Sequence, residues 1–477
     1  MTAVIKLDKM PGVARSLVRL FLFALPGRLF MKQHQDFTQG PILPVLLRFA
    51  LPVLLALLLQ AMYGAVDLQV VGRFGTAADI SAVSTGSQIM HTVTTVITGL
   101  AMGVTVLLGQ KIGEGNRTEA GAVVGGGICL FTVLALAVTA VLLAAAPWLA
   151  VVMQAPAGAF AGTVRYVRLC AAGGVFIVAY NLLGSIFRGV GDSTMPLLTV
   201  LIACVLNIAG DVLLVGIFRM GVAGAAIATV FAQAVSVVIS LVLLRRRQLP
   251  FVALPRSAVR FNGAVMRKIL RLGTPVALQD LLVSISFLVV IAIANAMGVT
   301  ASAGVGVAEK LCAFVMLVPS AYMQSMSAFV AQNIGAGRED RARRALWIGV
   351  TSSLVCGAVM AWGAFFHGDL LAGLFAADAA VVAAAWEYLK AYAIDCLLTS
   401  FLFCFVGYFN GRGQTLFVMA QGFLGAFGVR LPVALLVSRR AGSLFHLGLS
   451  TPASTVVQIV LCLVWFFKKE HAKSETP

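Results

Sequence analysis

Charged residues are scarce in this chain of 477 residues: they make up 11% of it, whereas soluble globular proteins carry about 25%. Acidic residues are the scarcest, with 18 Asp and Glu against 35 Lys and Arg. Hydrophobic residues make up 60%, and the mean hydropathy is +0.98. A soluble fold of this size would lack the polar side chains to cover its core, and a disordered chain would lack this much apolar mass. The composition therefore predicts a polytopic protein of the lipid bilayer.

Several familiar motifs are also missing. The eight Cys residues all lie in apolar runs, which excludes a secreted disulfide scaffold. The sequence has no H-E-x-x-H, no G-x-x-x-x-G-K-[ST] and no Cys or His cluster with metal-ligand spacing. We therefore expect no enzyme, no cofactor, no use of ATP and no metal other than Na⁺. The net charge of +17 does not indicate nucleic acid, because the basic residues lie in short gaps between apolar runs.

The apolar runs predict an all-α membrane protein, because they are continuous and do not alternate as the strands of a β-barrel would. A spanning helix needs roughly 20 mostly apolar residues. Twelve such spans are predicted, at residues 43–71, 80–109, 120–146, 163–187, 195–217, 222–244, 273–295, 303–333, 345–366, 381–409, 415–437 and 447–467.

The distribution of Lys and Arg predicts the orientation. Most of the 35 fall in residues 1–42, in the linker 245–272, between Arg338 and Arg344, and in the tail 468–477. This bias places both termini in the cytoplasm, in an inner membrane. Before the first span, Ser16–Lys32 is short and basic and is interpreted as a surface-lying amphipathic helix, and Met31 is an alternative start.

The chain repeats itself at an offset of about 222 residues. Arg48–Val53 matches Arg271–Val276, Gly109–Gly115 matches Ala331–Gly337, Tyr166 matches Tyr388, and Phe187–Ser193 matches Phe409–Thr415. Each half holds six spans, an even number, so the halves are parallel repeats. We expect an N-lobe (43–244) and a C-lobe (273–467) around a central cleft. Rocking of two such lobes alternates access to the cleft, which favours a transporter over a channel.

The most informative group of candidate site residues contains acidic residues inside the N-lobe spans. Asp67 and Asp211 lie at similar depth, with Thr229, roughly 7–11 Å below the outer surface, and Asn207 lies one turn from Asp211. Burying a carboxylate in hydrocarbon costs at least about 2.5 kcal/mol, so such groups usually serve a function. These oxygens can bind Na⁺ or share a proton. The alternative is that each Asp caps a broken helix or pairs with a local donor.

Other polar residues within spans are assigned to the substrate cleft or to contacts between and within the lobes. Pro52 can kink the first span, since proline removes a helix hydrogen bond; a static kink is the alternative. The repeat offset aligns Asp211 of the N-lobe with Val433 of the C-lobe, which cannot bind a cation, so the ion site is expected in one lobe only. The cleft and interlobe candidates are Tyr63, Asp280, Glu309, Lys310, Asp395 and Arg430.

Four segments carry a family resemblance. Met62–Gly75 resembles the first-span signature of the multidrug and toxic compound extrusion (MATE) transporters, as do Gly109–Gly115, Asn207–Asp211 and Gly221–Thr229. The resemblance covers about residues 37–467 and is greatest to bacterial branches with an N-lobe cation site.

The resemblance implies a twelve-helix antiporter, functional as a monomer, that expels small cationic, amphipathic organic compounds in exchange for H⁺ or Na⁺. It also implies that Asp67, Asn207, Asp211 and Thr229 form the cation site and that Pro52 bends the first helix. One branch uses a Glu in the seventh span, where this chain has Val283, which argues against that kind of C-lobe site.

Two alternatives stay open at this point. A lipid-linked oligosaccharide flippase of related architecture would need a strongly cationic cleft to hold pyrophosphate, and Lys310, Lys390 and Arg430 are few for that task. A sugar or solute carrier of the major facilitator type would carry an Asp-Arg pair among glycines between spans 2 and 3, and Lys111–Glu119 does not fit that pattern.

Overall fold

The computed structural model describes residues 36–247, 259–440 and 443–474, and these are almost entirely helical, without a strand among them. Eleven helices are long and apolar enough to cross a membrane, and a bent pair supplies a twelfth span. The all-α membrane fold is therefore confirmed. The predicted surface helix Ser16–Lys32, the alternative start Met31 and residues 248–258 of the predicted linker lie outside the described residues.

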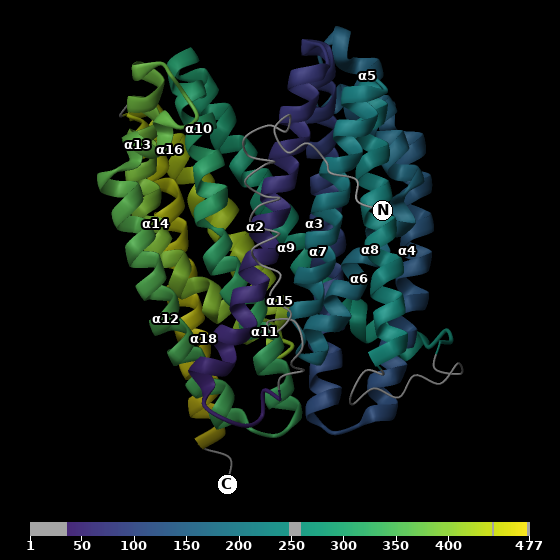
Figure 1. Cartoon of the computed structure of the whole chain (residues 1–477). Coiled ribbons are helices and arrows are strands. Elements are labelled where there is room, and N and C mark those ends of the chain that lie inside the picture. The colour runs from purple at the N-terminus through teal and green to yellow at the C-terminus, as the bar shows by residue number, and fades with distance from the viewer. Residues whose placement is uncertain (1–35, 248–258, 441–442, 475–477) are drawn as a thin grey trace.

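Two bundles stand side by side (Figure 1). The first six spans form one bundle, in which span 4 is the bent pair α5 and α6 and span 5 continues from α7 into a π-helix, η2. The bounds are α2 Ile42–Phe74, α3 Ala77–Gly113, α4 Arg117–Val152, α5 Ala157–Ala172, α6 Gly174–Val190, α7 Thr194–Asp211, η2 Val212–Ile217 and α8 Gly221–Arg247.

The second bundle repeats this order, with its own breaks. Span 8 consists of α10 and α11, and span 11 contains a second π-helix, η4. The bounds are α9 Gly263–Ala296, α10 Val299–Val315, α11 Leu317–Gly335, α12 Glu339–Phe366, α13 Gly368–Gly373, α14 Ala379–Gly411, α15 Thr415–Phe423, η4 Leu424–Arg430, α16 Leu431–Arg440, α17 Leu444–Gly448 and α18 Ser450–Ser474.

Several helices differ from the predicted spans at their ends. Both ends of the predicted linker 245–272 are helical, since α8 ends at Arg247 and α9 begins at Gly263. The last helix, α18, likewise continues into the predicted tail 468–477. Basic residues end an apolar run, but they are good helix formers and do not end a helix. Span 4, expected as one helix, bends by 57° at Gly173, which separates α5 from α6.

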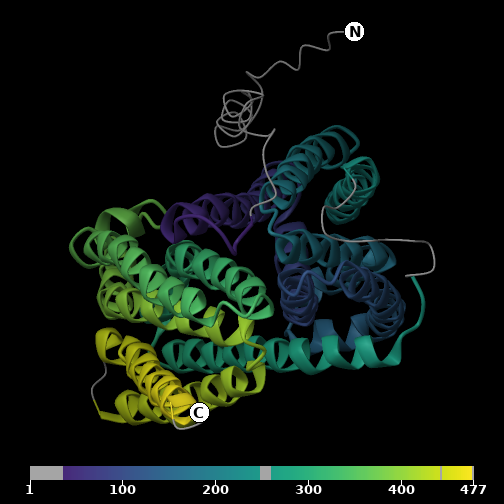
Figure 2. The same ribbon diagram turned by 90° about the horizontal axis from the view of Figure 1, so that it is seen from below.

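The first helix of each bundle is shared between the two lobes. Leu46 and Phe49, in the lower half of α2, are buried in a core made mainly of C-lobe residues, whereas Val70, in the upper half, is buried in the N-lobe core. Ile269 of α9 is buried among N-lobe residues, and Val290 among C-lobe residues. Seen from below, α2 and α9 run between the bundles on opposite edges of the molecule (Figure 2).

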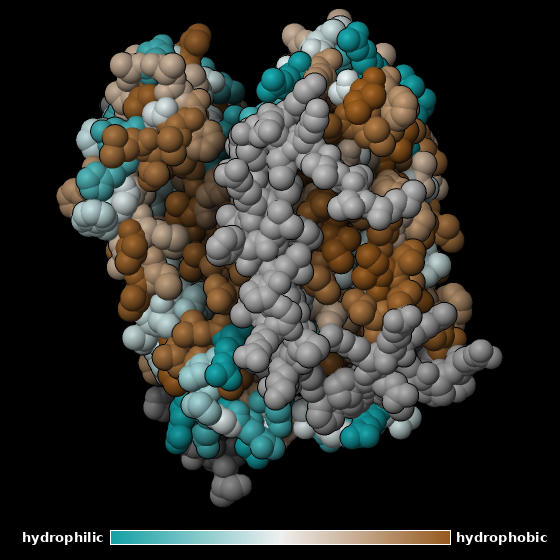
Figure 3. Space-filling model, viewed as in Figure 1, coloured by the Kyte–Doolittle hydropathy of each residue, from teal (hydrophilic) through white to brown (hydrophobic). Residues whose placement is uncertain are grey.

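The surface matches a membrane environment. Apolar side chains cover the middle of the molecule, polar ones gather at both ends, and a notch divides the upper end between the lobes (Figure 3). Large apolar residues are widely exposed on both bundles, for example Leu136 at 60% and Val355 at 63%. A soluble protein does not leave so much contiguous apolar surface in water.

Candidate cation site and its C-lobe counterpart

Three helices bring the predicted N-lobe residues together. Asp67 comes from α2, Asn207 and Asp211 from α7, and Thr229 from α8. The Asn207 Nδ2 donates to Thr229 Oγ1 at 3.3 Å, and Thr229 Oγ1 lies 3.5 Å from Asp67 Oδ2. Thr229 Oγ1 also donates to the Ala225 carbonyl at 3.0 Å. A hydroxyl has one proton, so the contact with Asp67 is weak.

The two carboxylates are buried and poorly satisfied by the protein. Asp67 is 5% exposed and Asp211 is fully buried. Among the described residues, no donor reaches Asp67 Oδ1, either Asp211 oxygen or Asn207 Oδ1. Buried acceptors without donors are costly, and hard cations such as Na⁺ prefer oxygen ligands. This oxygen-rich cluster therefore has the chemistry to take up a cation or a proton.

The local backbone changes at this cluster. Asp211 is the last residue of α7, and η2 begins at Val212. A π-helical turn inserted in an α-helix is uncommon and is frequent at functional sites. The π-helical turn shifts the residues after it out of the α-helical register. The side chains at the end of span 5 can therefore be oriented toward α2 and α8 differently than in a regular α-helix.

A small cavity adjoins the cluster inside the N-lobe. Its volume is about 20 Å³, enough for about one water molecule. Tyr63, proposed from the sequence as a cleft residue, lines this cavity, and Gln60 donates to the Tyr180 hydroxyl at 3.3 Å. The lining residues are Tyr63, Tyr180, Val200, Ala203, Asn207, Thr229, Ala232 and Gln233.

Polar residues of the C-lobe form a differently organised network. The hydroxyls of Tyr388 and Tyr392 donate to Glu309 Oε1 at 3.2 and 3.4 Å. Thr455 Oγ1 donates to Asp395 Oδ1 at 2.6 Å. These carboxylates thus have protein donors, unlike most of the buried oxygens of the N-lobe cluster.

Among the described residues of the C-lobe, Arg430 is the basic side chain that is buried. It ends η4, donates from Nη1 to Ser286 Oγ at 2.8 Å, and places its guanidinium 4.1 Å from the centre of the Phe287 ring. A cation over an aromatic face is stabilised electrostatically. Arg430 therefore connects span 11 to α9 within the C-lobe.

The remaining sequence candidates lie apart from these networks. Asp280 is half-buried on α9, and Lys310 is exposed on α10; no hydrogen bond of the described residues joins either side chain to Glu309 or Asp395. Pro52 lies within α2, which is one continuous helix. No group of three or more His, Cys, Asp or Glu side chains gathers in the described part of the chain.

Sequence reasoning missed several partners of these residues. Tyr388 was noted only as a repeat match, and Tyr392, Thr455 and Ser286 were not singled out. Tyr388 and Tyr392 are four residues apart, so they share one face of α14 and could have been recognised as a pair. Thr455 and Ser286 come from distant helices and carry no such signal.

Comparison with known proteins now decides the family. The sequence model of the MatE family matches residues 52–213 and 275–436, one segment in each bundle. The chain belongs to this family. MatE proteins are transporters and not enzymes, so the chain is a multi-pass membrane transporter that acts on small molecules.

The relatives agree with this assignment. The chain is 27% identical over 410 residues to "Probable multidrug resistance protein YpnP" of Bacillus subtilis (strain 168), covering 85% of this chain and 91% of that protein. It is also 27% identical over 378 residues to the "FAD transporter" of Shewanella oneidensis, covering 76% and 80%. These similarities support a MatE multidrug efflux transporter and do not favour a flippase.

A solved structure supports the fold. The outward-facing conformation of a multidrug resistance MATE family transporter of the MOP superfamily superimposes with a TM-score of 0.87 at 19% identity, covering 93% of this chain and 99% of the other. At this identity the comparison bears on the fold alone.

Proposed function

We propose that this MatE transporter is a secondary active antiporter that exports cationic, amphipathic compounds in exchange for H⁺ or Na⁺. One observation carries the proposal: Asp67 and Asp211 are buried beside Asn207 and Thr229, with carboxylate oxygens that no described donor reaches. An entering cation supplies the missing partner. The protein then needs no cofactor, because the ion gradient supplies the energy.

The proposed cycle uses competition for negative charge. With both aspartates ionised, the lobe attracts a cationic compound from the cytoplasmic side. An ion that enters from outside neutralises the cluster and favours release. Each elementary charge moved across 100 mV contributes about 2.3 kcal/mol, which is enough to bias two conformations strongly.

The proposed orientation follows the basic residues. Lys111, Arg188 and Arg412 lie at the lower ends of α3, α6 and α14, where Arg338 and Arg341 also lie, and the positive-inside rule assigns that end to the cytoplasm. Both termini would then be cytoplasmic, in the inner membrane, with the notch of Figure 3 opening outward. The lobes contact each other within one chain, so we propose that the monomer is the working unit.

The test is transport by the purified full chain in proteoliposomes. A fluorescent lipophilic cation is loaded, and its efflux is followed under a pH gradient and, separately, under a Na⁺ gradient. The proposal expects efflux that depends on at least one gradient and is lost in Asp67→Asn. Efflux at the wild-type rate in Asp67→Asn and Asp211→Asn would contradict it.

A second substrate class enters the same assay because one relative is a FAD transporter. Lys310 and Arg430 supply positive charge in the C-lobe, and an aromatic anion is the kind of compound such groups attract. Competition by FAD against the fluorescent cation distinguishes the two classes. Efflux of labelled FAD without efflux of the cation would replace the proposed substrate class and leave the ion coupling in place.

A further inference from the structure

Two helices end at matching positions of the repeat, at the lower end of the molecule. The last residues of α6 and α14 are Val190 and Gly411, and the turns that follow contain Gly191 and Gly413 with φ of 90° and 76°. Glycine at such a position ends a helix readily. The last four carbonyls of a helix have no donor within it, so those of Gly189 and Gly411 need one from elsewhere.

Each of these carbonyls receives its donor from the opposite lobe. Gln110 of α3 donates from Nε2 to the Gly411 carbonyl at 3.1 Å. Gln332 of α11 donates from Nε2 to the Gly189 carbonyl at 3.0 Å. The two bonds run in opposite directions across the lobe boundary, and both donors and both acceptors are related by the same internal offset.

Close packing of α3 on α11 positions both glutamines. A Cβ at Gly113 would collide with the backbone carbonyl of Gln332, and a Cβ at Gly335 would collide with that of Gln110. Only glycine permits helix backbones to approach so closely. Gln332 is 2% exposed, so its amide would have no replacement donor or acceptor while the lobes stay closed.

We propose that Gln110 and Gln332 form a reciprocal interlobe latch, in which each lobe caps a helix end of the other and holds the lower face closed. The latch rests on the proposed alternating access, but it needs no particular ion or substrate. When the lower face opens, water can form hydrogen bonds with both glutamine amides and both glycine carbonyls in place of the latch. The latch is therefore reversible, as a transporter requires.

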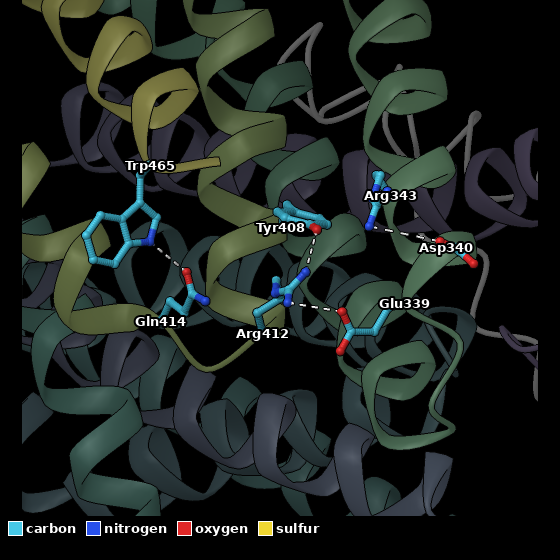
Figure 4. Close-up of polar contacts among 7 residues, drawn as sticks. All are labelled: Glu339, Asp340, Arg343, Tyr408, Arg412, Gln414 and Trp465. Carbon is cyan, nitrogen blue, oxygen red and sulfur yellow. Dashed lines mark hydrogen bonds and ion pairs between the residues drawn. The ribbon is translucent and has the colours of Figure 1, made fainter. Parts of the chain in front are cut away.

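The acceptor end in the C-lobe is fixed by contacts that stay within that lobe (Figure 4). Arg412 donates to the Tyr408 hydroxyl at 2.7 Å and lies 3.3 Å from Glu339. Trp465 Nε1 donates to Gln414 Oε1 at 2.9 Å, a bond that also lies within the C-lobe but involves neither Gly411 nor Arg412. The Gly411 carbonyl therefore moves with the C-lobe as a unit, and its bond from Gln110 must break on opening, together with the bond from Gln332 to Gly189.

The experiment measures backbone hydrogen exchange of the full chain in lipid nanodiscs, without ion gradient or substrate. In the double variant Gln110→Ala/Gln332→Ala we expect exchange at Gly109–Gly115 and Ala331–Gly337 to accelerate about tenfold, because one buried and one part-buried hydrogen bond no longer hold the lobes together. Exchange around Asp67 and Asp211, at the other end of the helices, should stay at the wild-type rate.

Gln414→Ala is the matched control, since it removes a glutamine at the same end whose bond lies within one lobe. It should leave exchange of α3 unchanged. Gln110→Met and Gln332→Met keep the length of the side chain but lose the donor, and either should reproduce the local acceleration if the double variant does not fold. Wild-type exchange at both lower ends in the donor-deficient variants, or equal acceleration in all helices, would overturn the latch. Neither result depends on whether the chain exports cations.

Discussion

The two lobes share a helix order but differ in how many hydrogen bonds the protein provides to their acidic side chains. In the N-lobe, Asp67 and Asp211 have carboxylate oxygens without a described donor. In the C-lobe, Glu309 and Asp395 accept hydroxyl hydrogen bonds from three side chains, and Arg430 is buried in the same lobe. Under the proposed function, the N-lobe copy of the repeat holds the exchangeable ion site, whereas the C-lobe carboxylates already accept hydrogen bonds from protein hydroxyls.

The largest expected effect comes from neutralising the N-lobe pair. Asp211→Asn should lower gradient-driven efflux by about tenfold to 100-fold, because an interaction with a charged group contributes about 1.5–3 kcal/mol. The measurement is initial efflux from proteoliposomes at matched protein content. Retention of most of the activity would remove the distinction between the lobes.

The sequence predicted the depth of the polar residues in the membrane, but it did not predict which residues of different helices contact each other. The depth of Asp67, Asn207, Asp211 and Thr229 within apolar runs was sufficient to group them, because a helix converts residue number into depth. The Asp395–Thr455 contact joins two helices of one lobe, and nothing in either run specifies the partner. The shared cores of α2 and α9 were missed for the same reason: an apolar run predicts a span and not the helix it packs on.

The next largest effect concerns the C-lobe network. Arg430→Met should destabilise the folded protein by roughly 1.5–3 kcal/mol, since it removes the charged donor to Ser286 and the cation over Phe287. Thermal unfolding in detergent, followed by tryptophan fluorescence, measures this loss. If the variant is as stable as the wild type but inactive, Arg430 serves transport directly and the C-lobe is not merely structural.

A smaller effect is expected at Thr229. Thr229→Val removes the hydroxyl that lies between Asn207 and Asp67. We expect the ion concentration for half-maximal efflux to rise about fivefold, which corresponds to about 1 kcal/mol for one hydrogen-bonding group. Thr229→Ser restores the hydroxyl and should restore the wild-type concentration. Equal shifts in both variants would exclude a role for the hydroxyl.

The smallest effect tests the C-lobe side of the comparison. Asp395→Asn keeps an oxygen that can accept from Thr455, so stability should change by no more than about 1 kcal/mol. Efflux should stay within about threefold of the wild-type rate. A loss as large as that of Asp211→Asn would mean that both lobes exchange ions.

The shared first helices have a mechanical consequence. Phe49 holds the lower part of α2 in the C-lobe core, and Val70 holds its upper part in the N-lobe core, with Pro52 and Asp67 in the same continuous helix. If the lobes rotate against each other, this helix must bend or turn between its two anchors. Since proline leaves one backbone carbonyl without its usual donor, the region of Pro52 is the least costly place to deform. Because α2 is anchored in both lobes, a change of ion occupancy at Asp67 would then change the twist of this helix and so the relative rotation of the lobes.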